Sequence, residues 1–156
     1  MLNIDRILCP VDFSESSARA YDHAQSLAGQ YHAKLFLQHV VEFLVPSDAY
    51  IPYAGSAAEL FESVRVDARR KLQDFANSHT GNGVPPECLL DEGTAPEAIL
   101  SCAKAQEVNL IVMGAHGLKG LDPISLGSVT EKVLRKARCP VLVIPKPGDD
   151  VAELIE

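Results

Sequence analysis

Short apolar runs of strand length alternate along this chain with longer segments of helical periodicity. The runs occupy residues 6–11, 34–41, 109–114 and 141–144, with a weaker one at 86–91. Because neighbouring positions in the runs are apolar, both faces of the expected sheet must be covered, which is typical of parallel strands. Strands alternating with helices predict right-handed crossovers. We therefore predict a single-domain α/β fold with a five-stranded, mostly parallel open sheet and helices on both faces, spanning residues 1–146 with a short C-terminal tail at 147–156.

The expected helices occupy residues 14–30, 57–78, 94–106 and 128–136. Gly29 is a candidate stop for the first helix, and Thr94 with Glu97 matches a capping box at the start of the third. Residues 43–55 contain Pro46, Pro52 and Gly55 and show no clear period. We interpret that segment as a loop.

Composition limits the classes of function. A chain of 156 residues with 47% hydrophobic residues suits one globular domain. Its net charge of −7 argues against a nucleic-acid or anionic-membrane partner. With no signal-like start and no membrane span, we expect a cytoplasmic protein. The four cysteines form no CxxC pair, so we expect buried thiols in place of a metal or redox site.

Four of the ten glycines lie between the fourth apolar run and the last helix: Gly114, Gly117, Gly120 and Gly127. In open parallel sheets, ligands bind beyond the carboxyl ends of strands, where the strand order reverses. The first strand ends near Asp12 and the fourth at Gly114, so both face that crevice if the two strands are neighbours.

The start of the last helix, at Gly127 and Ser128, offers free N–H groups and a positive dipole end to a phosphate. The hydroxyls of Ser128 and Thr130 would add donors. The same residues also permit a simple capping box between Ser128 and Glu131. Spacing alone leaves both interpretations open.

The usual nucleotide signatures, GxxxxGK[ST] and GxGxxG after a strand, are missing. Instead, Gly114, Gly117, Gly127 and Ser128 match the Gly-x2-Gly-x9-Gly-[Ser/Thr] signature of the universal stress protein family. The segments 10–14 (PVDFS) and 140–145 (PVLVIP) are also similar to that family. The chain therefore resembles the family's ATP-binding branch, up to about residue 145.

The resemblance implies a Rossmann-like fold of the adenine nucleotide alpha hydrolase type and a homodimeric, ATP-binding stress-response regulator, with Mg or Mn beside the triphosphate. By position, the resemblance implies that Pro10, Val11 and Asp12 line the nucleotide, and that the backbone of Val40 or Val41 contacts adenine. It places Met113, Gly114, His116 and Gly117 along the ribose and phosphates, and Gly127, Ser128, Val129 and Thr130 around the phosphate tail. Asp12 is the candidate metal ligand.

No nucleophile or carboxylate can be paired with His116 from sequence, so we expect a regulator without fast catalysis, not an enzyme. Two alternatives stay open: a slow ATPase or phosphotransferase that uses Asp12 and a metal, and a nucleotide-free dimerising scaffold. An apolar edge strand at Val141 to Ile144 predicts a homodimer through that strand, with a protein partner that the sequence leaves unknown. The basic run of Lys132, Arg135, Lys136 and Arg138 is explained by the dipole at a helix C-terminus.

Overall fold

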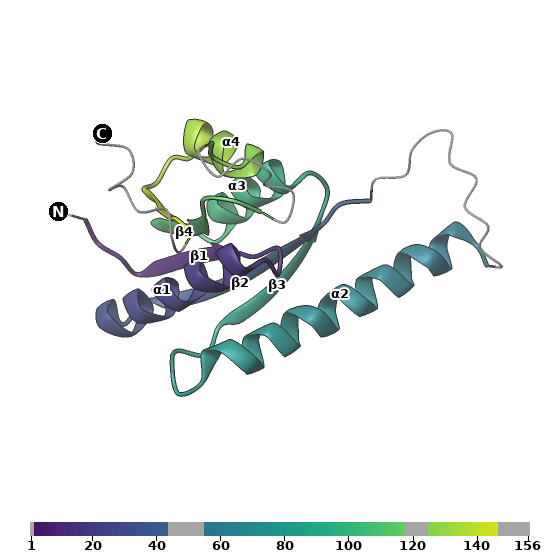
Figure 1. The fold of residues 1–156 in the computed structure, drawn as a ribbon, viewed down its shortest axis with the longest axis horizontal. Helices are drawn as coiled ribbons and strands as arrows, with labels where there is room; N and C mark the ends of the chain where they lie inside the picture. Colours follow the sequence, from purple (N-terminus) through teal and green to yellow (C-terminus); the bar gives the residue numbers. More distant parts are fainter. Residues whose placement is uncertain (1, 44–54, 118–124, 147–156) are drawn as a thin grey trace, which may run out of the picture.

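The computed structural model describes residues 2–43, 55–117 and 125–146, and it forms one parallel α/β sheet with four helices (Figure 1). The strand order is β3-β2-β1-β4-β5, and every described pairing is parallel. The strands are β1 (Arg6–Pro10), β2 (Lys34–Val41), β3 (Glu87–Glu92), β4 (Leu110–Gly114) and β5 (Val141–Ile144). The helices are α1 (Glu15–Tyr31), α2 (Ala57–Thr80), α3 (Ala95–Ala105) and α4 (Ser128–Lys136). The predicted fold class is confirmed.

Two helices cover each face of the sheet, with α1 and α2 on one side and α3 and α4 on the other (Figure 1). Successive residues of a strand point to opposite faces. In β1, Ile7 and Cys9 pack in the core beneath α1, whereas Leu8 packs in the core beneath α3 and α4. All three side chains are fully buried, which explains why β1 is apolar at successive positions.

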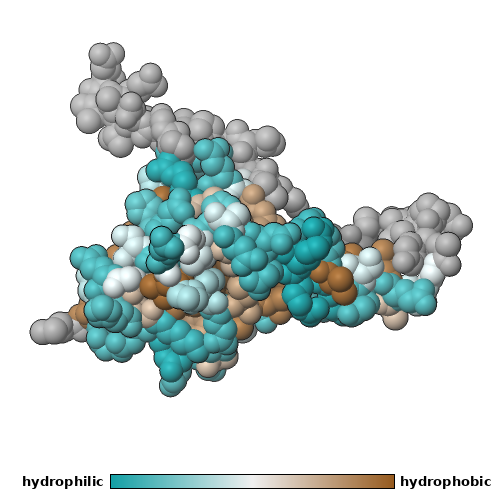
Figure 2. Space-filling model, turned by 90° about the horizontal axis from the view of Figure 1, so that it is seen from below, coloured by the Kyte–Doolittle hydropathy of each residue, from teal (hydrophilic) through white to brown (hydrophobic). Residues whose placement is uncertain are grey.

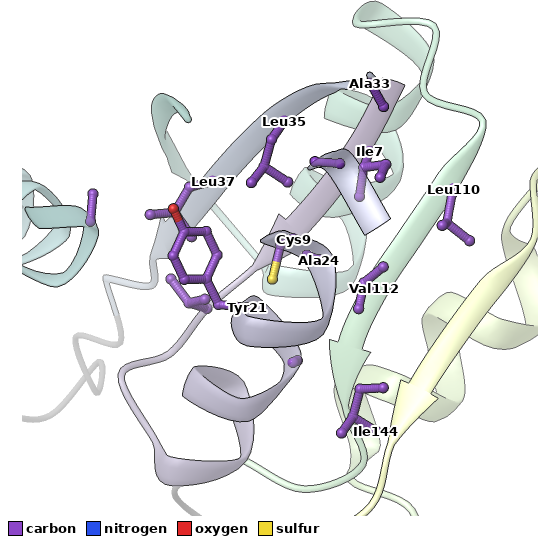
Figure 3. Packing of buried hydrophobic residues seen from close by; sticks show 14 of the residues in the cluster. Ile7, Cys9, Tyr21, Ala24, Ala33, Leu35, Leu37, Leu110, Val112 and Ile144 are labelled. Atoms are coloured by element: carbon purple, nitrogen blue, oxygen red, sulfur yellow. The ribbon is translucent and has the colours of Figure 1, made fainter. Parts of the chain in front are cut away.

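The core under α1 joins side chains of that helix to four strands. Tyr21 and Ala24 of α1 lie over Cys9 and Leu37, as Figure 3 shows. The Tyr21 hydroxyl keeps hydrogen bonds at the rim of this core, 2.7 Å from the Thr80 hydroxyl and 2.7 Å from the Gln25 amide. A large aromatic side chain is therefore buried without losing a partner for its polar end.

Two helix-boundary predictions were wrong. Gly29 lies inside α1, and the left-handed cap residue is His32, with φ 53°. Thr94 forms no side-chain cap on α3. Instead, Glu42 at the end of β2 accepts a hydrogen bond of 2.6 Å from the backbone N–H of Ala95. A carboxylate from a neighbouring strand, far away in sequence, has replaced the local cap.

The cysteine prediction holds in part within the described residues. Cys9 and Cys102 are buried, Cys88 and Cys139 are partly buried, and all four are free thiols. Burial raises the pKa of Cys102 to about 11 and raises the pKa of Cys9 further. Thiols held in the neutral form are poor nucleophiles and poor metal ligands.

The face shown in Figure 2 is mainly hydrophilic in its described part, with small, separate hydrophobic patches. Among the described helices, none combines the length and the apolar character that a membrane crossing requires. The expected loop at residues 43–55 falls almost wholly on residues 44–54, which lie outside the described residues. The same holds for the tail at 147–156.

Candidate functional site

The candidate site lies where the strand order reverses. β1 pairs with β2 on one side and with β4 on the other, so the carboxyl ends of β1 and β4 are neighbours. The connections from these ends run into α1 on one face and toward α4 on the other. This is the position at which open parallel sheets bind ligands, and the predicted crevice between Asp12 and Gly114 is placed there.

Asp12 opens the turn from β1 into α1. Its Oδ1 accepts a 3.0 Å hydrogen bond from the N–H of Ser14, and Ser14 in turn caps α1 by accepting from Ser17. The other carboxylate oxygen lies 2.7 Å from the place where a Cβ would stand on Gly117. Asp12 is therefore a turn residue whose carboxylate also reaches the glycine loop after β4.

The backbone of this turn is strained and is supported by aromatic rings. Phe13 adopts a φ of 65°, which is uncommon for a bulky residue. Its ring lies 4.4 Å from the His39 ring and 5.8 Å from the Phe75 ring. His39 also places Nδ1 at 2.8 Å from the carbonyl oxygen of Val11. The histidine from β2 thus fixes the turn that presents Asp12.

Gly114 allows α1 and β4 to meet. A Cβ on Gly114 would stand 2.4 Å from Oγ of Ser16 and 2.9 Å from its backbone C and O. On the other side, the Thr130 hydroxyl of α4 donates a 2.8 Å hydrogen bond to the Gly114 carbonyl. Thr130 is almost fully buried, and its hydroxyl proton is already used in the hydrogen bond to Gly114. The structure therefore does not support the expectation that this hydroxyl donates to a ligand.

The start of α4 carries no side-chain cap. Gly127 is the N-cap residue, and the capping box between Ser128 and Glu131 is not formed. Glu131 pairs with Arg135 at 2.6 Å instead, and Ser128 is exposed. The first N–H with an acceptor inside the helix belongs to Glu131, which donates to Gly127. The N–H groups of Ser128, Val129 and Thr130 therefore have no partner within α4.

Gly127 brings this helix start close to the loop after β4. Its N–H donates to the carbonyl of Ala115 at 2.7 Å, and a Cβ on it would stand 3.6 Å from the backbone nitrogen of Gly117. Three of the signature positions, Gly117, Gly127 and Ser128, thus lie around the same end of the sheet. Gly120, with Lys119 and Asp122, is outside the described residues.

The two valine candidates at the end of β2 differ in their backbone. The carbonyl of Gln38 faces β1, where it accepts from the N–H of Val11, and the carbonyl of Val41 faces β3, where it accepts from Gly93. Since backbone groups alternate sides along a strand, Val40 directs its N–H and C=O to the β1 side, beyond the last β1 pairing at Pro10. Val40 is thus the better placed of the two to contact a ligand through its backbone.

The remaining candidates are buried or partly buried. Pro10, Val11 and Met113 are buried at the ends of β1 and β4, and the partly buried Val129 packs against the core beneath α3 and α4. His116 is also buried, and its backbone N–H lies 3.5 Å from Oγ of Ser16. These residues shape the crevice, while polar groups at its edge come from Asp12 and the start of α4.

The sequence interpretation missed Ser16 and His39 as residues that build the site. Three serines at 14, 16 and 17 after Asp12 were a usable signal, because only one of them is needed as a cap. For His39 there was no such signal, because a contact across 28 residues to Val11 has no local signature.

Within the described ranges, no group of three or more His, Cys, Asp or Glu side chains is placed to hold a metal ion. Two hollows in the described part, of about 490 and 430 Å³, lie elsewhere than at the junction of β1 and β4, one beside β3 and α3 and the other between the ends of α3 and α4.

Fold and site together define a class: a small parallel α/β domain with an uncapped helix start and a glycine loop at its topological switch point. Sequence comparison agrees, since the model of the universal stress protein family matches residues 3–145. The chain belongs to this family.

Known relatives support that assignment. Universal stress protein MJ0531 of Methanocaldococcus jannaschii is 33% identical over 142 residues, covering 91% of this chain and 82% of the relative. The solved structure of MJ0577 has a TM-score of 0.75 at 26% identity and covers 94% of this chain and 98% of its own. A universal stress protein solved in complex with cAMP has a TM-score of 0.60 at 24% identity, covering 92% of this chain and 98% of its own, and it shows the shared fold.

Proposed function

We propose that this protein is an ATP-binding universal stress protein that acts as a nucleotide-dependent stress-response regulator without fast turnover. The observation that carries the proposal is the uncapped start of α4 beside the glycine loop. The simplest alternative use of Ser128, a capping box with Glu131, is not formed. Backbone N–H groups without an acceptor inside the helix, at a helix start, favour a phosphate ligand.

The residues present fit an adenine nucleotide. The N–H groups of Ser128, Val129 and Thr130 would receive the phosphate tail, and the backbone of Val40 would contact the adenine edge. The relative in complex with cAMP shows that an adenine nucleotide is compatible with the fold in that protein. At its level of identity it carries no residue assignments to this chain.

Asp12 is the candidate residue for a Mg or Mn ion that accompanies the triphosphate. Carboxylate oxygens are preferred ligands of Mg²⁺, which usually binds one or two of them together with phosphate oxygens. The carboxylate of Asp12 adjoins Gly117, so it lies on the side of the crevice where the phosphates would pass. One protein carboxylate with substrate oxygens is an ordinary Mg²⁺ site and does not need a protein cluster.

The arrangement favours binding over fast chemistry. Asp12 already accepts a hydrogen bond from the turn, and His116 is buried. Neither stands in a described arrangement of nucleophile, base and orienting group. A slow ATPase that uses Asp12 and a metal remains the alternative, and product formation that disappears in Asp12→Ala would favour it.

Thermal unfolding with Mg-ATP, AMP, cAMP and GTP tests the proposal. At 100 times its dissociation constant, a ligand stabilises the native state by about 2.7 kcal/mol. For a domain of this size, that raises the unfolding midpoint by roughly 5–11 °C. The nucleotide-free scaffold predicts no shift with any of the four ligands.

Two serine variants make the test specific. Ser56 caps α2 through a complete capping box, so Ser56→Ala lowers the stability of the free protein by about 1 kcal/mol and leaves the ATP shift unchanged. Ser128 has no cap role, so Ser128→Ala leaves the free protein unchanged. It reduces the ATP shift, because the exposed hydroxyl of Ser128 would donate to the phosphates beside the backbone N–H groups. If Ser128→Ala behaves as Ser56→Ala does, the phosphate assignment at α4 is wrong.

We also infer a homodimer through β5. β5 is an edge strand in the sheet, and Leu142 within it is 39% exposed. An open apolar edge favours pairing with the same strand of a second copy, which would bury both the unpaired backbone groups and Leu142.

A further inference from the structure

The basic run at the end of α4 borders a hollow that the proposed nucleotide site does not use. This hollow of about 430 Å³ lies between the C-terminal ends of α3 and α4. Val108 and Ile111 form part of an apolar lining and are buried. Since helices and strands run in opposite directions in a parallel α/β fold, the hollow lies at the opposite end of the sheet from the uncapped start of α4.

Three cations line this hollow: Lys104, Lys136 and Arg138. Glu107 is the single acidic residue in the lining. In the described part of the chain, none of the three cations forms an ion pair. A net positive, apolar hollow is unusual in a protein of net charge −7.

Helix dipoles explain only part of this arrangement. Lys104 and Lys136 lie in the last turns of α3 and α4, where a cation offsets the dipole. Arg138 follows the end of α4, and the dipole effect falls off within the last turn. The dipole also gives no reason for the apolar lining between the cations. A ligand with carboxylates and apolar groups would match both features.

We propose that residues 147–156 of the same chain occupy this hollow. The segment reads PGDDVAELIE, with four carboxylates, no Lys or Arg, and the apolar residues Val151, Leu154 and Ile155. The other hollow, beside β3 and α3, does not suit this segment. Asp91, Glu92 and Glu97 line that hollow and would repel an acidic segment. Charge therefore selects the hollow between α3 and α4.

The segment is long enough to reach the hollow. Ile111, in its lining, pairs with Val141 at the start of β5. The tail leaves after the far end of β5 and must return the length of that strand, about 10 Å. Ten residues span up to roughly 33 Å when extended, which leaves length for the return and for crossing to α4. Docking would tie the chain end to the surface formed by α3 and α4.

Alkylation of Cys139 in the full chain tests this docking, because Cys139 also lines the hollow and is partly buried. The test variant is Lys136→Glu with Arg138→Glu, and the control is Arg69→Glu with Lys132→Glu, an equal charge change on exposed residues outside the hollow. Losing two exposed ion pairs lowers a docking constant by about two- to thirtyfold. We expect Cys139 to react about twofold or more faster in the test variant and unchanged in the control.

The direction of this change is diagnostic. Removing cations beside a thiol raises its pKa and by itself slows alkylation at a fixed pH, so a faster reaction reports an uncovered hollow. Cys88, which lies outside the hollow, serves as the internal reference. Adding Asp150→Lys and Glu153→Lys to the test variant restores the opposite charges and returns the slow rate.

Backbone ¹⁵N relaxation of residues 150–156 completes the test. We expect these amides to be ordered at low salt, to become flexible in the test variant, and to show order that does not depend on protein concentration. Flexible amides at low salt, or an unchanged Cys139 rate in the test variant, overturn the proposal. Order that grows with concentration also overturns it, because the occupant would then be the tail of a second copy.

Discussion

Replacing Gly114 by alanine tests how the two sides of the site are held together. A Cβ at this position would stand 2.9 Å from the backbone C and O of Ser16 and 2.4 Å from its Oγ. Ordinary contact begins near 3.4 Å, so the start of α1 and the end of β4 must move apart by roughly 0.5 Å, since the backbone cannot rotate away.

Overpacking of this kind costs about 1–3 kcal/mol, and the lower entropy of the unfolded alanine chain returns about 0.4–1 kcal/mol. The central values of these two ranges leave a net loss of about 1.3 kcal/mol, or roughly 3–5 °C in the midpoint of thermal unfolding. Urea unfolding monitored by circular dichroism measures the loss, with the slope against denaturant unchanged if only the native state is strained.

Two further variants separate the causes. Gly29→Ala places a Cβ where nothing lies within 4 Å, inside α1, so it raises stability by about 0.5–1 kcal/mol. Ser16→Ala combined with Gly114→Ala removes the closest atom but leaves the backbone contact, so it recovers only part of the loss. A Gly114→Ala protein as stable as the wild type would refute the reasoning, since the close approach would then be tolerated without strain.

Three other predictions concern single features. Thr130→Val removes the hydrogen bond to the buried carbonyl of Gly114, and we expect a loss of about 1–3 kcal/mol in urea unfolding. Leu142→Lys places a charge on the exposed β5 edge, and sedimentation should show monomers where the wild type is dimeric; a monomeric wild type contradicts the dimer. Burial raises the pKa of Cys102 to about 11 in the folded protein, so its contribution to stability is complete below pH 9 and is lost as pH rises toward 11. Unfolding at pH 8 and pH 10 checks this, and Cys102→Ala should lose less stability over that interval.

Sequence patterns predicted the fold almost completely because the informative interactions are repeated along each element. Apolar residues at successive positions of β1 and β4 predicted a sheet that is buried on both faces. Helix ends were harder to predict because their caps come from anywhere in the fold. Glu42 reaches Ala95 across 53 residues, and no local pattern contains that information.

The site was predicted in position but not in detail. The glycine spacing led us to expect Gly117 and Gly127 together at the junction of β1 and β4, and the structure brings them together there; ligand binding at this junction stays a prediction. The spacing of residues in the sequence does not show which hydroxyl already has a hydrogen-bond partner in the fold. Thr130 and Ser128 therefore looked equivalent as candidate phosphate ligands. In the structure, Thr130 is buried and bonded to Gly114, whereas Ser128 is exposed and has no cap role.

The glycines of the site therefore serve two separate physical needs. Gly114 and Gly127 permit backbones to approach each other, since a Cβ at either position would crowd Ser16 or Ala115. At Gly117 the nearest atom is a side-chain oxygen of Asp12, 2.7 Å from the place of an added Cβ. Moving that carboxylate would disturb the hydrogen bond that its other oxygen accepts from the N–H of Ser14. Gly117 therefore leaves room for the Asp12 carboxylate, the candidate metal ligand of the proposed site, whereas Gly114 and Gly127 leave room for backbone.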